Sequence, residues 1–367
     1  MKILIYLAHP AQFHFFKNAI DILKSKGNEL KVLIKSKDIL EDLLVSHGME
    51  YSNVQVNLRK NNYISIFFAL IERTFKILTI ASKFKPNILI GTDASVSYVG
   101  KLIGKPTITT LEDDYEVIKN LANLAYPVTS HILVPEVCGV GKWTDKKIGY
   151  RGYMKLAYLH PSRFKADQSV KFKYISEERY CLIRMSKLAA HHDIGIRALN
   201  VEFIQNIIQS VESRGFSVYL STEGKVPDSL MKYELKVKPE DIHHVMAFAS
   251  LLISDSQSMS VEAALLGVPS VRISDFAGRI SVLEELEHKY GLTFGYKIDQ
   301  KELIVTKINE LLDNVDTSVL FKQRKEKMML EKIDVSAFLI WFIEEYPQSA
   351  HTMRENPDYQ NRFIVTN

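Results

Sequence analysis

The chain contains little cysteine, glycine or proline. Its 367 residues include 2 cysteines, 16 glycines and 11 prolines. Cys138 and Cys181 lie far apart in the sequence and match no metal-ligand spacing, so neither a disulfide framework nor a cysteine metal site is expected. Sparse, unpaired cysteine favours a reducing compartment, and we expect a cytoplasmic protein.

Long apolar runs and a strong charge of one sign are also missing. No stretch reaches the ~18 apolar residues of a membrane-spanning helix, and the apolar segment at Met1 lacks the long core and cleavage site of a signal peptide. The net charge is +4, from 47 basic and 43 acidic residues. This small excess argues against nucleic acid as a partner. It is compatible with anionic substrates or with loose contact to an acidic membrane face.

What the sequence does contain is a regular alternation of short apolar runs and longer helical patterns, which predicts parallel sheets with helices on both faces. In the first half, the expected strands are Ile3–Leu7, Glu29–Ile34, Ile88–Gly91, Thr107–Thr110 and His131–Val134. In the second half, they are Tyr180–Met185, Ser217–Ser221, Leu251–Ser254 and Ser270–Ile273. The expected helices are His14–Lys26, Asn200–Arg214, Glu240–Ala249, Lys301–Leu312 and Val335–Glu345.

Two such series predict an α/β fold of two Rossmann-like domains whose parallel sheets face a central cleft. We place the first domain at residues 1–155 and the second at residues 156–334. Residues 335–367 then form a helix that crosses back to the first domain, followed by a polar, loosely held tail. Ligands of such sheets bind beyond the carboxyl ends of the strands.

The segment from Ser254 to Pro269 is the most informative in the chain. An expected strand ends in a turn of hydroxyl residues, and a helix follows at once. A helix N-terminus offers unpaired backbone N–H groups and a positive dipole end, which together suit a phosphate. Ser256 and Ser258 would add hydroxyl donors there, and Glu262 would grip a pair of ribose hydroxyls. The plainer interpretation is an ordinary capped helix, because serine is a common N-cap.

Five strings in order resemble the domain-of-unknown-function family 354, over roughly residues 1–335. They are His9–Lys17 (HPAQFHFFK), Tyr153–Pro161 (YMKLAYLHP), Ala189–Asp193 (AAHHD), Pro239–His244 (PEDIHH) and the Ser254–Pro269 segment. That family is related to GT-B glycosyltransferases and to UDP-N-acetylglucosamine 2-epimerases. The resemblance implies a GT-B-like fold and a nucleotide-sugar substrate, with no required cofactor and no metal.

The chain departs from the epimerase pattern at two places. Their Asp-Ser-Gly-Gly turn is replaced by Asp255-Ser256-Gln257-Ser258, although Glu262 matches their ribose-binding carboxylate. Their His-Arg-Arg-Glu-Asn string is missing after the first strand of the second domain. Both departures favour a transferase. The two glutamates seven residues apart of many retaining transferases are also missing, which mildly favours an inverting mechanism.

Stabilising a diphosphate leaving group calls for helix N-termini and cations. Arg184 closes an expected strand with a planar, multiply donating cation, and its plainer interpretation is an exposed strand-end arginine. Ser186, His191 and His192 follow it. The histidines would contact phosphate or sugar, or form a metal fragment for which no third ligand has a fitting spacing.

The resemblance implies that backbone near Lys238 reads the base, and that His244 either contacts the ligand or packs beneath it. The nucleotide-binding candidates are Arg184, Ser186, His191, His192, Lys238, His244, Ser256, Gln257, Ser258, Met259 and Glu262.

In the first domain, an acceptor hydroxyl must lose a proton to a base. His14 has the pKa range such a base needs, although a histidine among aromatic residues is often a packed helix residue. Asp93 follows a strand in a setting that loosely resembles the epimerases' Gly-Asp-Thr turn. Glu112, Asp113 and Asp114 follow another strand, and bunched carboxylates raise one another's pKa in a partly dry site; the plainer interpretation is a solvated helix cap. We select His14, Asp93, Glu112 and Asp114 as catalytic candidates.

Residues 57–86 are apolar and aromatic and are bordered by basic residues such as Arg59, Arg73 and Lys83. This pattern is expected of a basic amphipathic surface that touches an anionic bilayer and meets a lipid-linked acceptor. The plainer interpretation is a crossover helix that packs on the first sheet, with its charges in solvent.

The sequence therefore predicts a GT-B glycosyltransferase that moves a sugar from a nucleotide donor, foremost a UDP-sugar, to a glycan or lipid-linked acceptor in surface polysaccharide assembly. One alternative is a hydrolysing UDP-N-acetylglucosamine 2-epimerase that uses Asp93 and Glu112. Another is a non-catalytic nucleotide-sugar-binding protein. We expect a cytoplasmic location, at the inner membrane face if residues 57–86 touch lipid. The base, the sugar, the acceptor, the stereochemistry and the oligomeric state stay open.

Overall fold

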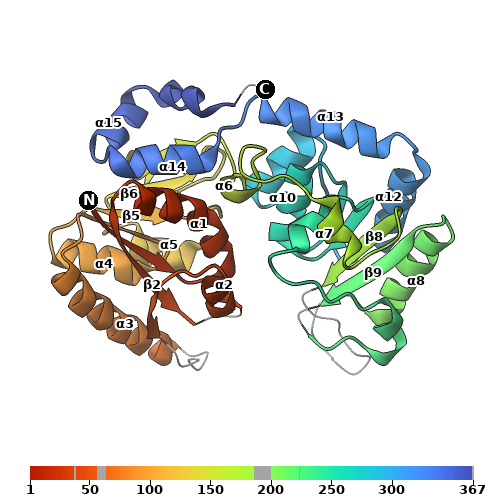
Figure 1. The fold of residues 1–367 in the computed structure, drawn as a ribbon, viewed down its shortest axis with the longest axis horizontal. Coiled ribbons are helices and arrows are strands. Elements are labelled where there is room, and N and C mark those ends of the chain that lie inside the picture. Colours follow the sequence, from red (N-terminus) through yellow and green to blue (C-terminus); the bar gives the residue numbers. More distant parts are fainter. Residues whose placement is uncertain (37–38, 56–62, 186–199, 223, 366–367) are drawn as a thin grey trace. The chain divides into compact units, whose positions relative to one another are not determined.

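The computed structural model describes residues 1–36, 39–55, 63–185, 200–222 and 224–365 (Figure 1). They form two compact units: unit 1 comprises residues 1–163 and 332–367, and unit 2 comprises residues 164–331. The sequence places the first boundary at residue 155. Helix α6 (Leu156–Leu159) lies beyond that point but packs on α1 (Pro10–Ser25), so it belongs to unit 1.

Unit 1 is built on a seven-stranded sheet in which every pairing is parallel. In spatial order, the strands are β3 (Ser52–Gln55), β2 (Glu29–Lys35), β1 (Lys2–Leu7), β4 (Ile88–Gly91), β5 (Thr107–Thr110), β6 (His131–Pro135) and β7 (Lys147–Tyr150). The order reverses between β1 and β4. In open α/β sheets this switch point is where ligands bind, beyond the carboxyl ends of the strands.

Helices cover both faces of this sheet, which is why β1 and β4 consist almost entirely of apolar residues. The helices of unit 1 are α1, α2 (Leu40–Ser46), α3 (Tyr63–Phe84), α4 (Ala94–Leu102), α5 (Lys119–Ala125), α6, α14 (Val335–Glu344) and α15 (Gln348–Glu355), with the 3-10 helices η1 (Thr144–Lys146) and η4 (Pro357–Phe363). In Figure 1, α1 and α2 lie on one face, and α3 and α4 lie on the other. Residues 3–7 of β1 are wholly buried between these layers.

Helix α1 begins at Pro10 and not at the predicted His14. Proline suits the first helical turn because its φ is already helical and its missing N–H would have no partner there. The side chain of His9 caps the helix, since its Nδ1 accepts a hydrogen bond from the Ala11 N–H at 3.2 Å. A histidine cap is not among the common N-caps, so the sequence pattern missed this start.

Helix α3 carries the chain from β3 to β4 and packs on the sheet. Its Ile77 and Ala81 are buried in one core with Leu4 and Leu89 of the strands. The described part of residues 57–86 therefore forms the crossover helix of the two interpretations. Among the described residues, none of the helices combines the length and apolarity that crossing a bilayer requires. Contact of this surface with lipid stays a prediction.

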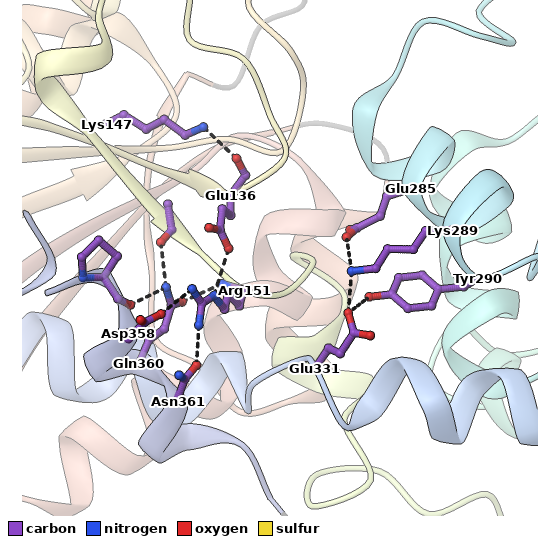
Figure 2. A network of polar contacts seen from close by, with 12 residues as sticks. Glu136, Lys147, Arg151, Glu285, Lys289, Tyr290, Glu331, Asp358, Gln360 and Asn361 are labelled. Atoms are coloured by element: carbon purple, nitrogen blue, oxygen red, sulfur yellow. Dashed lines mark hydrogen bonds and ion pairs between the residues drawn. The ribbon is translucent and has the colours of Figure 1, made fainter.

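The C-terminal segment is held firmly on unit 1, so the prediction of a loose tail is wrong. Helix α14 is largely buried and packs on α1 and α6. Figure 2 shows that Arg151, which follows β7, donates to Asp358 Oδ1 and Asn361 Oδ1, both at 2.6 Å. The Arg151 backbone N–H donates to Gln360 Oε1 at 2.6 Å. These bonds fasten η4 to the edge of the sheet.

Unit 2 contains a second sheet, of five strands, again parallel at every pairing. In spatial order, the strands are β12 (Phe294–Tyr296), β11 (Ser270–Ile273), β10 (Leu251–Ser254), β8 (Tyr180–Met185) and β9 (Ser217–Thr222). The order reverses between β10 and β8. Ser254 pairs with Arg184 across this switch point, so both residues lie where a ligand is expected.

The helices of unit 2 are α7 (Gln168–Phe172), α8 (Val201–Glu212), α9 (Ile242–Met246), α10 (Gln257–Leu266), α11 (Ser281–Glu284), α12 (Lys301–Asp313) and α13 (Thr317–Met329), with the 3-10 helix η2 (Asp228–Tyr233) and the π-helix η3 (Glu285–Lys289). Helices α9 and α10 pack on one face of the sheet, where Val245 and Ala263 meet Leu182 and Leu252. Beyond α13, Glu331 accepts hydrogen bonds from Lys289 and Tyr290 (Figure 2).

Candidate functional site

The turn from β10 into α10 forms the clearest candidate site. Ser256 is the N-cap: its Oγ accepts from the Met259 N–H at 3.3 Å, and its own N–H donates to Ser254 Oγ at 2.9 Å. Within the described part of the chain, no acceptor faces the N–H groups of Gln257 and Ser258, the first two of the helix. We call these two N–H groups at the N-terminus of α10 the anion seat, because such groups and the helix dipole suit an anion. That a phosphate binds there stays a prediction.

The side chain of Gln257 ties α10 to the neighbouring strand. Its Nε2 donates to Ser274 Oγ at 2.7 Å, and its Oε1 accepts from Arg272 Nη1 at 2.8 Å. Arg272 is wholly buried, and its Nη2 lies 3.8 Å from a Glu287 oxygen and 4.0 Å from a Glu284 oxygen. Burial lowers the pKa of Arg272 and raises that of Glu287. Gln257 thus contributes its backbone N–H to the anion seat, while its side chain fixes the helix to the neighbouring strand.

Removing the cap tests how firmly this seat is built. The Ser256→Ala variant loses the bond to the Met259 N–H, and we expect the free energy of unfolding to fall by about 1 kcal/mol. Urea denaturation measures the change. Ser258→Ala is the matched control, because the Ser258 side chain makes no capping bond, and its effect should stay within about 0.5 kcal/mol. Equal losses in the two variants would contradict the capping role of Ser256.

Glu262 lies further along α10 and is 8% exposed. Its Oε1 lies 3.4 Å from Nε2 of His243 on α9, and His243 is 7% exposed. The sequence selects the neighbouring His244, whose Nδ1 accepts from the Asp167 N–H at 3.0 Å and whose ring centroid lies 4.8 Å from that of Phe164. Burial lowers the pKa of His244. The histidine that contacts Glu262 is therefore one position earlier than the one selected.

Arg184 lies beside the turn into α10. Its backbone oxygen accepts from the Asp255 N–H at 3.3 Å, and its Nη1 donates to Ser221 Oγ at 3.0 Å. The backbone of Arg184 thus lies beside the turn, while its guanidinium bonds to β9, which flanks β8 on the side opposite to β10. A guanidinium is a planar cation that suits a phosphate, and that role of Arg184 stays a prediction.

Of the other nucleotide-binding candidates, two lie in the described part of the chain and three do not. Met259 packs against the core of unit 2, and its backbone N–H is taken by the Ser256 cap. Lys238 is exposed before α9. Ser186, His191 and His192 lie outside the described residues.

In unit 1, Asp93 is engaged in the structure of the switch point. Its Oδ1 accepts from the Ser95 N–H at 2.9 Å and so caps α4. Its Oδ2 lies 2.9 Å from Nη2 of Arg73, whose side chain is 4% exposed. The Nη1 of Arg73 donates to Gln55 Oε1 at 2.6 Å. These contacts explain the conformation of Asp93 without a catalytic role.

Two of the three carboxylates that follow β5 are also engaged. Glu112 Oε1 accepts from the Met154 N–H at 2.6 Å, and its Oε2 forms an ion pair with Lys155, whose side chain is 7% exposed. Asp114 Oδ1 accepts from the Gly139 N–H at 2.7 Å. Glu112 and Asp114 thus hold the loops that follow the strands.

Asp113, between them, has the electrostatics of a proton acceptor. Its pKa is raised by burial in the first place and by the charges of Glu112 and Asp114 in the second, against the opposing charge of Lys155. The sequence predicts raised pKa values for this cluster but selects its two outer members. The sequence shows three adjacent acids, but it does not show which of them will have the raised pKa. That depends on the ion pair and the backbone contact that the fold gives to Glu112 and Asp114.

His14 is half-buried on α1. Its ring centroid lies 5.3 Å from that of Phe13 and 5.1 Å from that of Tyr158, so the structure favours packing among aromatic rings. Sequence reasoning missed Gln12, two residues earlier on the same helix. Gln12 Nε2 donates to Thr92 Oγ1 at 2.8 Å and so links the two turns that flank the switch point.

Metal ligands do not gather anywhere in the described ranges. Among these residues, no group of three or more His, Cys, Asp or Glu side chains is arranged to hold a metal ion.

No protein-family model and no curated protein sequence matches this chain. Solved structures do resemble it. A UDP-N-acetylglucosamine 2-epimerase from Neisseria meningitidis, bound to UDP-N-acetylglucosamine, is 13% identical, with a TM-score of 0.66 over 94% of this chain and 100% of that chain. A UDP-N-acetylglucosamine 2-epimerase from Methanocaldococcus jannaschii is 14% identical, with a TM-score of 0.64 over 86% and 94%.

A third similar structure is a glycosyltransferase from Streptomyces sp. SF2575, which is 13% identical, with a TM-score of 0.59 over 94% of this chain and 100% of that chain. At such identities the likeness shows the fold alone. Together with the two parallel sheets, it confirms the predicted α/β fold of the GT-B type.

Proposed function

We propose that the chain is an enzyme acting on a nucleotide-activated sugar, and specifically a glycosyltransferase with a UDP-sugar donor. The observation that carries the proposal is the anion seat at α10, with two backbone N–H groups that lack an acceptor in the described chain and Glu262 further along the same helix. The diphosphate would accept from those N–H groups and from the Ser258 hydroxyl. Arg184 would add charge to stabilise the departing UDP.

In the proposed reaction, an acceptor hydroxyl attacks carbon 1 of the donor sugar. The new carbon–oxygen bond forms as the bond from carbon 1 to the phosphate oxygen breaks, and UDP leaves with the electron pair. Asp113 of unit 1 would accept the hydroxyl proton, because its raised pKa suits a general base. The acceptor would be a glycan or lipid-linked sugar of surface polysaccharide assembly.

The epimerase alternative is favoured by one observation, because the two epimerase structures match with higher TM-scores, 0.66 and 0.64, than the 0.59 of the glycosyltransferase. Against it, the carboxylates that it would use for proton transfer are held elsewhere. Asp93 is paired with Arg73, and Glu112 is paired with Lys155. We therefore place glycosyl transfer first.

Two assays test the proposal. A thermal-shift panel of UDP-, GDP-, CMP- and dTDP-sugars should show one clear stabiliser, worth about 2.7 kcal/mol when its concentration is about 100 times its Kd. Incubation with UDP-N-acetylglucosamine alone should then leave the sugar nucleotide intact. Release of UDP and N-acetylmannosamine without an acceptor would establish the epimerase instead, and a panel without any stabiliser would overturn both.

A further inference from the structure

The contact between His243 and Glu262 has no part in the proposed reaction. The two residues come from different helices, α9 and α10, and Nε2 of His243 lies 3.4 Å from Oε1 of Glu262. Their side chains are 9% and 11% exposed. Burying a carboxylate to this degree is costly unless a donor or a cation faces it. His243 supplies such a group.

The contact also restricts the Glu262 side chain. A glutamate that is free to rotate loses about 1.5–2 kcal/mol of rotamer entropy when a ligand fixes it. A partner that fixes it in the folded protein removes this cost from the binding step. An ionised carboxylate accepts about four hydrogen bonds, so one contact to His243 is compatible with gripping two sugar hydroxyls.

His243 is itself held from several sides. The Tyr180 hydroxyl, on β8, donates to the Val245 carbonyl at 2.6 Å and so fastens α9 to the sheet. The Tyr174 hydroxyl donates to Asp241, at the start of α9, at 2.7 Å. The Phe164 ring meets the His243 ring edge-on, with centroids 6.2 Å apart. The imidazole is therefore a rigid support for the carboxylate.

We propose that His243 is a positioning residue that makes this site select a ribose nucleotide over a 2′-deoxyribose nucleotide. The inference rests on the proposed nucleotide site at α10. Glu262 can discriminate between the two pentoses only if its carboxylate is already aimed at the 2′-hydroxyl. His243 aims it from behind, without touching the ligand.

The test compares two amide variants that differ by one methylene. In His243→Gln the amide nitrogen extends about as far as Nε2 of histidine, whereas in His243→Asn it falls short of Glu262. Both variants keep a polar group at the buried position, so both should fold. His351→Asn is the matched control, because Nε2 of His351 lies 3.2 Å from Oε2 of Glu355 in an exposed pair on α15. Calorimetry measures Kd for UDP and for 2′-deoxy-UDP, and for GDP and 2′-deoxy-GDP.

The wild type and the His351 control should prefer the ribose form of one pair about tenfold, the worth of one hydrogen bond to a carboxylate. His243→Asn should bring that ratio close to one, mainly by weakening the ribose form, and His243→Gln should restore it. An unchanged ratio in His243→Asn, even with both affinities reduced, would overturn this inference alone. Equal wild-type affinities for both forms would do the same. A wild type that binds neither pair would overturn the proposed nucleotide site itself.

Discussion

Glu262→Ala should weaken the binding of UDP about 100-fold, because two hydrogen bonds to a charged group are worth about 3 kcal/mol or more. The loss should come from the ribose contacts: inorganic diphosphate, which is assigned to the N-terminus of α10 and does not reach Glu262, should bind the variant as well as the wild type. Calorimetry with the two ligands measures both effects.

The control for this variant is Glu302→Gln, at an exposed position in the first turn of α12. It should leave both affinities unchanged. A Glu262 variant that loses UDP and diphosphate equally would indicate a collapsed site and would contradict the division of roles between Glu262 and the helix N-terminus. A variant that keeps its affinity for UDP would remove Glu262 from the site.

Asp113→Asn should lower kcat by about 100-fold or more, since the amide cannot take the acceptor proton. The Kd of UDP should stay the same, because the nucleotide is assigned to unit 2. Initial rates and calorimetry separate the two quantities. Glu116→Gln, three residues later and exposed, is the control that should leave the rate unchanged. A fully active Asp113→Asn would require another base.

The raised pKa of Asp113 has two consequences with fixed signs. The base must be ionised, so the rate should fall as pH drops through the pKa of Asp113, which is raised from its ordinary value. The folded state also holds the Asp113 proton more tightly than the unfolded state, so this group favours folding below its unfolded pKa, and that contribution is lost as pH rises through the folded pKa. Asp113→Asn should therefore be at least as stable as the wild type at neutral pH.

Much of the sheet architecture can be predicted from local pattern. Strands β4, β5, β8, β10 and β11 begin and end where the sequence places them. Parallel strands buried on both faces are rich in apolar and β-branched residues, which makes the limits of these strands visible in the sequence. The short strands β3, β7 and β12 were not predicted. Residues Ser52–Gln55 contain a single apolar side chain, and β12 has three residues with a central glycine.

Contacts between distant segments explain the remaining differences. The polar residues after Pro347 have no sequence pattern that shows that Asp358 and Asn361 bind Arg151 at the edge of the sheet. Asp93 follows a strand like a catalytic acid, but its partner Arg73 comes from a helix for which the sequence also left a membrane surface open.

For two further residues of the candidate site, the packing of a helix determines which way the side chain faces. His243 and His244 are adjacent and chemically identical, and only the packing of α9 shows that His243 faces Glu262. Gln257 opens α10 as the sequence suggests, but its side chain turns inward because buried Arg272 lies on the neighbouring strand. The turn from strand to helix at Ser256 could be predicted from the sequence, and the supporting residues around it could not.

The most direct measurement is a crystal structure of the protein grown with UDP. The account predicts phosphate oxygens within hydrogen-bonding distance of the Gln257 and Ser258 backbone N–H groups, with the ribose hydroxyls on the Glu262 carboxylate. Electron density for the nucleotide at any other place, or a Glu262 carboxylate turned away from the pentose, would contradict it.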